Sequence, residues 1–160
     1  QVEAMTMSTK IAVMKLGVIQ QMDTPDMVYH YPANLFVADF IGNPKVNLMP
    51  GWVSGQNIVD IGKFNIPVKT FNKTGDVVVG LRPEDIVVHK EPTDGAVEFA
   101  AYSVLPSGAD TTIIARKGDT ELTIKEMGVS KIQMDQPVWL SFKEDAINLY
   151  DKETEELITA

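Results

Sequence analysis

The residues best suited to acid–base or metal chemistry are two histidines and several clustered carboxylates. His30 and His89 are the only histidines in 160 residues, and they fall in different predicted parts of the chain. A metal site would need both of them and a carboxylate partner, so we interpret them as surface side chains. The carboxylates follow apolar segments, where solvated turns are expected more than acid/base pairs. These groups are Glu84/Asp85, Glu144/Asp145 and Asp151/Glu153/Glu155/Glu156.

The sequence lacks the glycine patterns that bind nucleotide phosphates. Neither G-x-x-x-x-G-K-[ST] nor G-x-G-x-x-G occurs. The absence of cysteine excludes disulfides, thiolate zinc sites and thiol nucleophiles. No nucleophile-elbow spacing supports a Ser-His-Asp triad, which leaves a small hydrolase as the least supported of three hypotheses. We therefore predict no catalytic, cofactor-binding or metal-binding residue in this chain.

The segment at 80–85, Gly-Leu-Arg-Pro-Glu-Asp, gathers one arginine and two carboxylates around a proline. Pro83 has a fixed φ and keeps Arg82 extended, so the preceding strand has to end there. Glu84 and Asp85 then open a turn, and the planar guanidinium of Arg82 can reach a carboxylate. We interpret Arg82, Glu84 and Asp85 as a structural charge lock. A role in a subunit interface or in docking a regulator is the alternative.

The elements ahead of this corner follow from local signals. Residues 10–20 predict a β-hairpin around Gly17, because glycine tolerates positive φ. Thr24, followed by a proline, predicts the capped start of a short helix. Apolar side chains near helical spacing at 35–41 predict a second helix that stops at Gly42. We expect this hairpin and helix to pack on the following domain or on a second copy.

From about residue 48 onward, short apolar runs alternate with turn signals at intervals of roughly 8–12 residues, which favours an all-β barrel or sandwich. The strict alternation of apolar and polar residues in DTELTI and VWLSF predicts strands with one buried face and one solvent-exposed face. We place a domain boundary near 43–46, which separates a unit at 1–45 from a unit at 46–160. The expected strands are 48–54, 58–61, 64–68, 77–81, 86–89, 96–105, 111–116, 121–126, 138–142 and 146–150.

Composition limits the classes of partner. The net charge is -8 with a pI near 4.7, and no dense Lys/Arg block occurs, so nucleic acid is not expected as a partner. No run approaches the ~20 apolar residues of a membrane span, and no signal peptide is predicted. Trp52 and Trp139 are expected in core or interface packing rather than in base stacking. Six of the eight methionines lie in the first fifty residues, where we expect buried filling more than the alternative, an adaptable docking surface.

In order, these segments resemble the C-terminal part of the ATP-binding subunit of bacterial ABC importers of the maltose and multiple-sugar type. The matching stretches are QVEAM at 1–5, KIAVMKLGVIQ at 10–20, the Thr-Pro to Phe-Ile-Gly run at 24–47, GLRPED at 80–85 and the tail at 141–158. Met22-Asp23 stands where a glycine usually precedes Thr-Pro. The stretch LPSGADTTI has an altered loop but retains the acidic-hydroxyl pair Asp110-Thr111.

The resemblance implies a mainly β fold for 46–160, an OB-like, transport-associated (TOBE, MOP-like) barrel preceded by a small α+β remnant of the ATPase domain at 1–45. It implies that the ATP and Mg²⁺ sites belong to the parent protein and are absent from this chain. The implied partners are a second copy in a homodimer, membrane-spanning permease subunits through the parent, and a regulatory protein. The implied location is cytoplasmic, at the inner face of the bacterial plasma membrane.

Under this resemblance the chain is the regulatory and dimerising portion of a protein that couples ATP hydrolysis to carbohydrate import. The alternative from another class is a free-standing OB-type module that binds a small oxyanion or an oligosaccharide. The acidic balance and the lack of clustered Lys/Arg argue against oxyanion binding.

Overall fold

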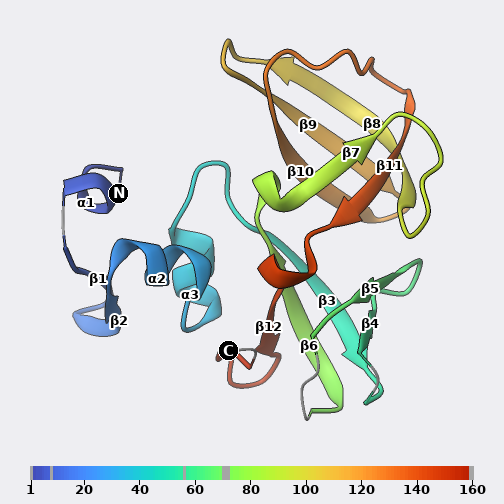
Figure 1. Cartoon of the computed structure of the whole chain (residues 1–160). Coiled ribbons are helices and arrows are strands. Elements are labelled where there is room, and N and C mark those ends of the chain that lie inside the picture. Colours follow the sequence, from blue (N-terminus) through green and yellow to red (C-terminus); the bar gives the residue numbers. More distant parts are fainter. Residues whose placement is uncertain (1, 8, 56, 70–72, 159–160) are drawn as a thin grey trace.

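The computed structural model describes residues 2–7, 9–55, 57–69 and 73–158. Figure 1 shows a small N-terminal part, made of short helices and a hairpin, beside a larger β part. The small part runs through α1, β1, β2, α2 and α3, with bounds Val2–Met7, Ile11–Lys15, Val18–Asp23, Pro25–His30 and Leu35–Phe40. The sequence analysis does not predict α1. It predicts the other four elements, β1, β2, α2 and α3, and the structure confirms them.

Local signals account for the hairpin and for the start of α2. Leu16 and Gly17, between β1 and β2, have φ values of 50° and 80°, the pair of positive angles that a tight two-residue hairpin turn requires. The Thr24 hydroxyl accepts a hydrogen bond from the backbone N–H of Met27 at 3.3 Å, and Pro25 occupies the first helical position. Each feature depends on neighbours in sequence, which is why the sequence predicts it.

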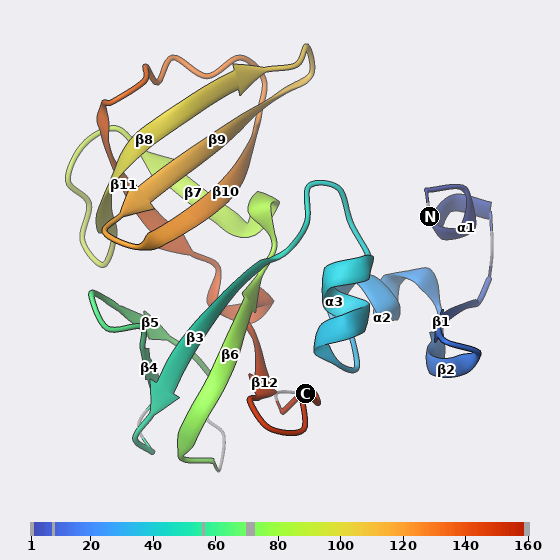
Figure 2. The same cartoon turned by 180° about the vertical axis from the view of Figure 1, so that it is seen from behind.

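The β part consists of two five-stranded antiparallel sheets, ordered β10-β9-β8-β11-β7 and β12-β6-β3-β4-β5. In Figures 1 and 2 the first sheet curls above the second. Every expected strand is present with ends within two residues, which confirms the mainly β, OB-like fold. The bounds are β3 Asn47–Val53, β4 Ile58–Asp60, β5 Asn65–Pro67, β6 Gly75–Leu81, β7 Ile86–His89, β8 Val97–Pro106, β9 Asp110–Lys117, β10 Thr120–Met127, β11 Pro137–Phe142 and β12 Asn148–Asp151.

One apolar core lies under both sheets. Val79 and Leu149 from one sheet and Ile124 and Leu140 from the other are fully buried members of the same cluster. Burial of each such side chain contributes about 1.5–3 kcal/mol, so the shared core holds the sheets together. The N-terminal part has a separate, smaller cluster of Ile11, Val13, Val28, Val37 and Ile41. The proposed boundary at 43–46 stays a prediction.

The expectation of buried methionines is wrong. Only Met49 lies in the core and Met5 is half-buried, whereas Met7, Met14, Met22, Met27, Met127 and Met134 are exposed. The hairpin explains part of this methionine exposure, because β1 and β2 form a sheet of only two strands and Leu16 at its turn is 94% exposed. The hairpin is therefore not covered by the β part, while α3 buries Val37 and Ala38. Packing of the hairpin on a second copy stays a prediction.

The tryptophans are not core residues either. Trp52 is exposed and Trp139 is half-buried. Their role in an interface stays a prediction. Across the described ranges, no helix is both long enough and apolar enough to cross a bilayer.

Candidate functional site

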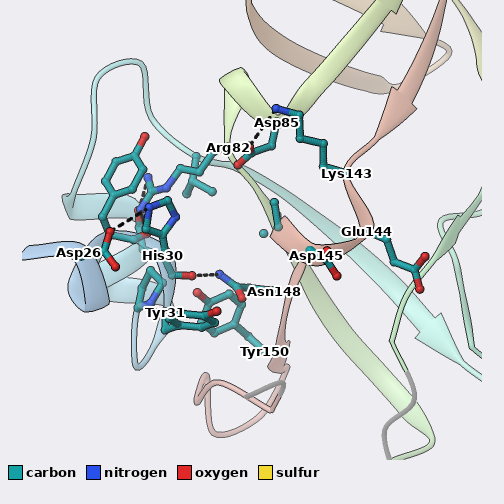
Figure 3. Close-up of a pocket in the computed structure, with 16 residues that line it drawn as sticks. Asp26, His30, Tyr31, Arg82, Asp85, Lys143, Glu144, Asp145, Asn148 and Tyr150 are labelled. Carbon is teal, nitrogen blue, oxygen red and sulfur yellow. Dashed lines mark hydrogen bonds and ion pairs between the residues drawn. The ribbon is translucent and has the colours of Figure 1, made fainter.

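The candidate site lies where the N-terminal helices meet the β part. The chain leaves β6 at Leu81, makes a one-turn 3-10 helix at Pro83–Asp85, and continues into β7. This turn faces α2 and α3, and a cavity of about 590 Å³ opens between them and the turn at Glu144–Ala146 (Figure 3). We call this region the Arg82 junction, after the side chain that crosses it.

Arg82 reaches from the end of β6 into the N-terminal helices. It is 5% exposed and is the only charged residue that is buried in the described part of the chain. Its Nη1 donates to the carbonyl oxygens of Ile41 at 2.5 Å and Ala38 at 3.4 Å, and its Nη2 donates to the carbonyl oxygen of Tyr29 at 3.2 Å. The guanidinium carbon also lies 4.4 Å from the centroid of the Tyr29 ring. One side chain therefore holds both helices.

Helix chemistry explains why carbonyl groups receive this arginine. The last carbonyl groups of a helix have no partner within the helix, and that end carries partial negative charge. Ala38 and Ile41 lie at the C-terminal end of α3, so a guanidinium there satisfies acceptors that would otherwise be buried and unpaired. Asn34 holds the opposite end of α3 by accepting a hydrogen bond from the N–H of Val37 at 2.9 Å.

Gly42 makes the approach of Arg82 possible. Its φ is +111°, an angle that side-chain-bearing residues rarely adopt. A Cβ at this position would lie 2.8 Å from Nη1 of Arg82, which is closer than real Cβ contacts. The glycine therefore ends α3 and also leaves room for the guanidinium.

The three charged residues at 82–85, Arg82, Glu84 and Asp85, lie at one turn, but they have different partners. Among the described residues, Arg82 forms no ion pair with a carboxylate. Glu84 accepts a hydrogen bond from the Tyr29 hydroxyl, and Asp85 pairs with Lys143 at 3.8 Å. The pairing of Arg82 with a carboxylate, suggested by the sequence, is therefore corrected. The physical reason is that the helix-end carbonyl groups, which only the tertiary fold brings near, accept from the guanidinium.

Burial sets the electrostatics of the junction. It lowers the pKa of Arg82 below its ordinary value, although arginine stays charged. Burial, and next the neighbouring charge of Glu84, raise the pKa of Asp85. Burial, followed by the hydrogen bond to Glu84, raises the pKa of Tyr29 well above 10. The phenol is therefore neutral and donates to the Glu84 carboxylate throughout the physiological range.

The C-terminal segment closes the junction from the other side. Asn148 donates to the carbonyl oxygen of His30 at 2.9 Å, as Figure 3 shows. Beyond β12 the chain returns to the helices, where Leu35 N–H donates to Glu155 O at 3.0 Å and Leu157 N–H donates to Ala33 O at 2.9 Å. The sequence analysis misses these contacts, and no local signal identifies them, because they join residues more than 100 positions apart.

The histidines do not form a metal centre with each other. His30 lies 3.4 Å from Asp26, one turn earlier on α2, whereas Nε2 of His89 lies 2.9 Å from the Ser141 hydroxyl on β11. In the part of the chain that the structure describes, no three His, Asp or Glu side chains are grouped to hold a metal ion. The observed hydrogen bonds of the Arg82 junction connect the N-terminal helices to the β part.

Comparisons with known proteins agree with this architecture. The family model described as the MalK OB fold domain matches residues 42–86, from Gly42 into β7. The chain is 39% identical over 96% of its length to the xylose/arabinose import ATP-binding protein XacK of Haloferax volcanii, and covers 43% of that protein. It is 33% identical over 96% of its length to the trehalose/maltose import ATP-binding protein MalK of Thermococcus litoralis, covering 45% of it. The chain thus spans less than half the length of these relatives.

A solved structure resembles this chain in fold. The cytoplasmic molybdate-binding protein ModG, crystallised with molybdate bound, superposes with a TM-score of 0.56 over 64% of this chain and 94% of its own. The sequences are 11% identical, so the likeness concerns the fold alone.

Proposed function

This chain belongs to the family of ATP-binding subunits of sugar-type ABC importers, and from that premise we propose that it forms their C-terminal regulatory and self-associating part. The whole protein would couple ATP hydrolysis to carbohydrate uptake. It would work with membrane-spanning permease subunits at the cytoplasmic face of the membrane. ATP and Mg²⁺ would bind to a portion of the parent protein that this chain does not include.

The observation that carries the regulatory role is the buried position of Arg82. This residue extends from the OB-type part and holds the main chain of α2 and α3, which correspond to the end of the ATPase domain in the proposal. A partner that binds the β part would therefore act on the helices through a side chain and not through a flexible linker. Signals from a regulator, or from a second copy, would reach the ATPase domain by this route.

The self-associating role is tested with the 160-residue chain in solution. Sedimentation velocity across a range of concentrations is expected to give a monomer–dimer equilibrium, because exposed apolar side chains on the hairpin favour coverage by a second copy. A species that stays monomeric at every concentration, with the N-terminal segment sensitive to protease, would overturn this part of the proposal.

Calorimetry separates the proposed function from its alternative. Titration with Mg²⁺·ATP, molybdate, sulfate and maltose is expected to give no binding heat. Tight binding of molybdate or sulfate would instead favour an oxyanion-binding module, and binding or turnover of ATP by this chain would contradict the proposal directly.

A further inference from the structure

Trp52 is an exposed tryptophan on the outer face of the second sheet. Its side chain is 51% exposed, and in the strand register it lies directly opposite both Asp60 of β4 and Asp76 of β6. Directly opposed residues point to the same face of an antiparallel sheet, with Cβ atoms about 4.5–5.5 Å apart. Both aspartates are exposed. The indole therefore lies on the same face of the sheet as the two neighbouring carboxylates, one residue before the end of β3 at Val53.

Acidic groups outnumber basic groups around this tryptophan. A cavity of about 640 Å³ beside it is lined by Asp76, Asp151, Glu153, Lys73 and Lys152. Lys73 already pairs with Asp151. In the described chain, neither Asp60 nor Asp76 has an ion-pair partner, although Asp60 accepts a hydrogen bond from the N–H of Gly62 at 2.7 Å. Such a surface repels phosphates and attracts a cation.

A filled version of the same arrangement occurs elsewhere in the chain. On the first sheet, the guanidinium carbon of Arg116 lies 3.4 Å from the centroid of the Tyr102 ring, and its Nε donates to Glu121 at 2.8 Å. An aromatic ring, a guanidinium and a carboxylate are thus combined there. The Trp52 surface has the ring and two carboxylates, and among the described residues no cation lies over its ring.

A guanidinium over the Trp52 ring would have to come from another molecule. The chain has two arginines, Arg82 and Arg116, and both are held by contacts within the chain. A second copy therefore offers no free arginine. A guanidinium suits the surface better than an ammonium, because its plane stacks on an indole while its fork donates to a carboxylate, whereas an ammonium is compact and strongly hydrated.

We propose that Trp52, Asp60 and Asp76 form a docking site for an arginine side chain presented by a partner protein. The surface is separate from the Arg82 junction, so this inference does not depend on the proposed function. It predicts that a short peptide with one arginine binds at Trp52, that the affinity depends on the charge of the side chain, and that the carboxylates supply that dependence.

The test follows the indole N–H signals of the 160-residue chain by NMR, with Trp52→Phe to assign them and half-buried Trp139 as the internal reference. Acetyl-Gly-Gly-Arg-Gly-Gly-amide is expected to shift the Trp52 signal saturably and to leave Trp139 unchanged. The citrulline peptide, which has nearly the same shape without the charge, is expected to bind about tenfold more weakly. Binding of the arginine peptide should also weaken at about 1 M salt, where the Debye length is about 3 Å.

Variants locate the charge dependence. Asp76→Asn is expected to weaken binding of the arginine peptide about fivefold, whereas Asp94→Asn, an equal change of charge in an exposed loop, should leave it unchanged. If Asp76→Asn disturbs the sheet, Asp60→Asn gives a second measurement of how far the affinity for the arginine peptide depends on a carboxylate. Equal binding of the arginine and citrulline peptides would overturn the proposal, as would the absence of any saturable shift. A shift caused by methyl α-glucoside and not by the arginine peptide would identify a carbohydrate platform instead.

Discussion

Asn47 and Thr123 exchange two hydrogen bonds although 76 positions separate them. The Asn47 Nδ2 donates to the carbonyl oxygen of Thr123 at 2.8 Å, and the N–H of Thr123 donates to Asn47 Oδ1 at 2.8 Å. The same Nδ2 donates to the carbonyl oxygen of Leu81 at 3.2 Å. One buried amide thus substitutes for a neighbouring strand at the edge of β10 and ties the two sheets together.

Removal of this amide should destabilise the fold. Asn47→Ala leaves a buried N–H and buried carbonyl groups unpaired, so we expect the free energy of unfolding to fall by about 2–3 kcal/mol. Asn47→Asp should be less stable at pH 7 than at pH 3, because the ionised carboxylate cannot donate to the two carbonyl groups. Urea unfolding measures both effects. Asn65→Ala, at an exposed position on β5, should change stability by less than about 0.5 kcal/mol; a similarly small effect of Asn47→Ala would contradict this account.

Arg82 should control the attachment of the N-terminal helices. Arg82→Ala removes the donors to Tyr29, Ala38 and Ile41, so we expect stability to fall by about 3 kcal/mol and proteolysis within residues 1–45 to become faster. Arg82→Lys keeps the charge but loses the fork, and should restore less than half of the loss. Thermal unfolding and limited proteolysis measure these changes. If Arg82→Ala abolishes self-association at an unchanged melting temperature, Arg82 acts in a subunit interface and not in the Arg82 junction.

Tyr29 should contribute stability that is lost in alkali. Burial, and next its hydrogen bond to Glu84, raise its pKa in the folded state above the unfolded value of about 10. The contribution is therefore complete below about pH 10 and disappears as the pH rises through the folded pKa. Tyr29→Phe should be about 1 kcal/mol less stable than the parent at pH 8, and the two should converge above pH 10. Urea unfolding at pH 8 and at increasing pH values above 10, with Tyr102→Phe as the exposed control, is the measurement; a difference between parent and Tyr29→Phe that stays constant over this range would refute the assignment.

The contribution of Asp85 to stability should depend on pH as expected for a carboxyl group whose pKa is raised in the folded state. Burial and the charge of Glu84 favour its protonated form in the folded state, so its contribution is complete below its unfolded pKa and is lost as the pH rises through the folded value. Asp85→Asn removes a half-buried charge and should raise the melting temperature at pH 7, with a smaller difference at pH 3. Asp119→Asn makes the same change of charge at an exposed turn. An equal gain from that variant would mean that only net charge matters.

The sequence predicted the elements of this protein because their signals are local. The turn at Leu16 and Gly17, the cap at Thr24 and the alternating strands each depend on residues within a few positions of one another. The ordered set of segments also identified the family. The sequence analysis predicts no element at Val2–Met7, where the structure has α1.

The partners of the charged side chains could not be predicted in this way. The triad at 82–85 was identified as a corner, yet Arg82 lies against helix ends some forty positions earlier in the chain, and Asn148 holds the backbone at His30. The prediction of buried methionines is wrong for a related reason, since burial depends on whether another element covers the face. Composition does not contain that information.

By itself, the sequence determined the strands to within two residues, the hairpin, the helices α2 and α3, that the fold is mainly β, and which family the chain resembles, because backbone preferences and turn geometry act over short stretches. Only the tertiary structure decided which acceptors Arg82 would satisfy, that Asn47 would join two sheets, and that Trp52 would stand between two carboxylates. These arrangements depend on the distances between segments far apart in the chain, which are set when the two sheets and the N-terminal helices pack together.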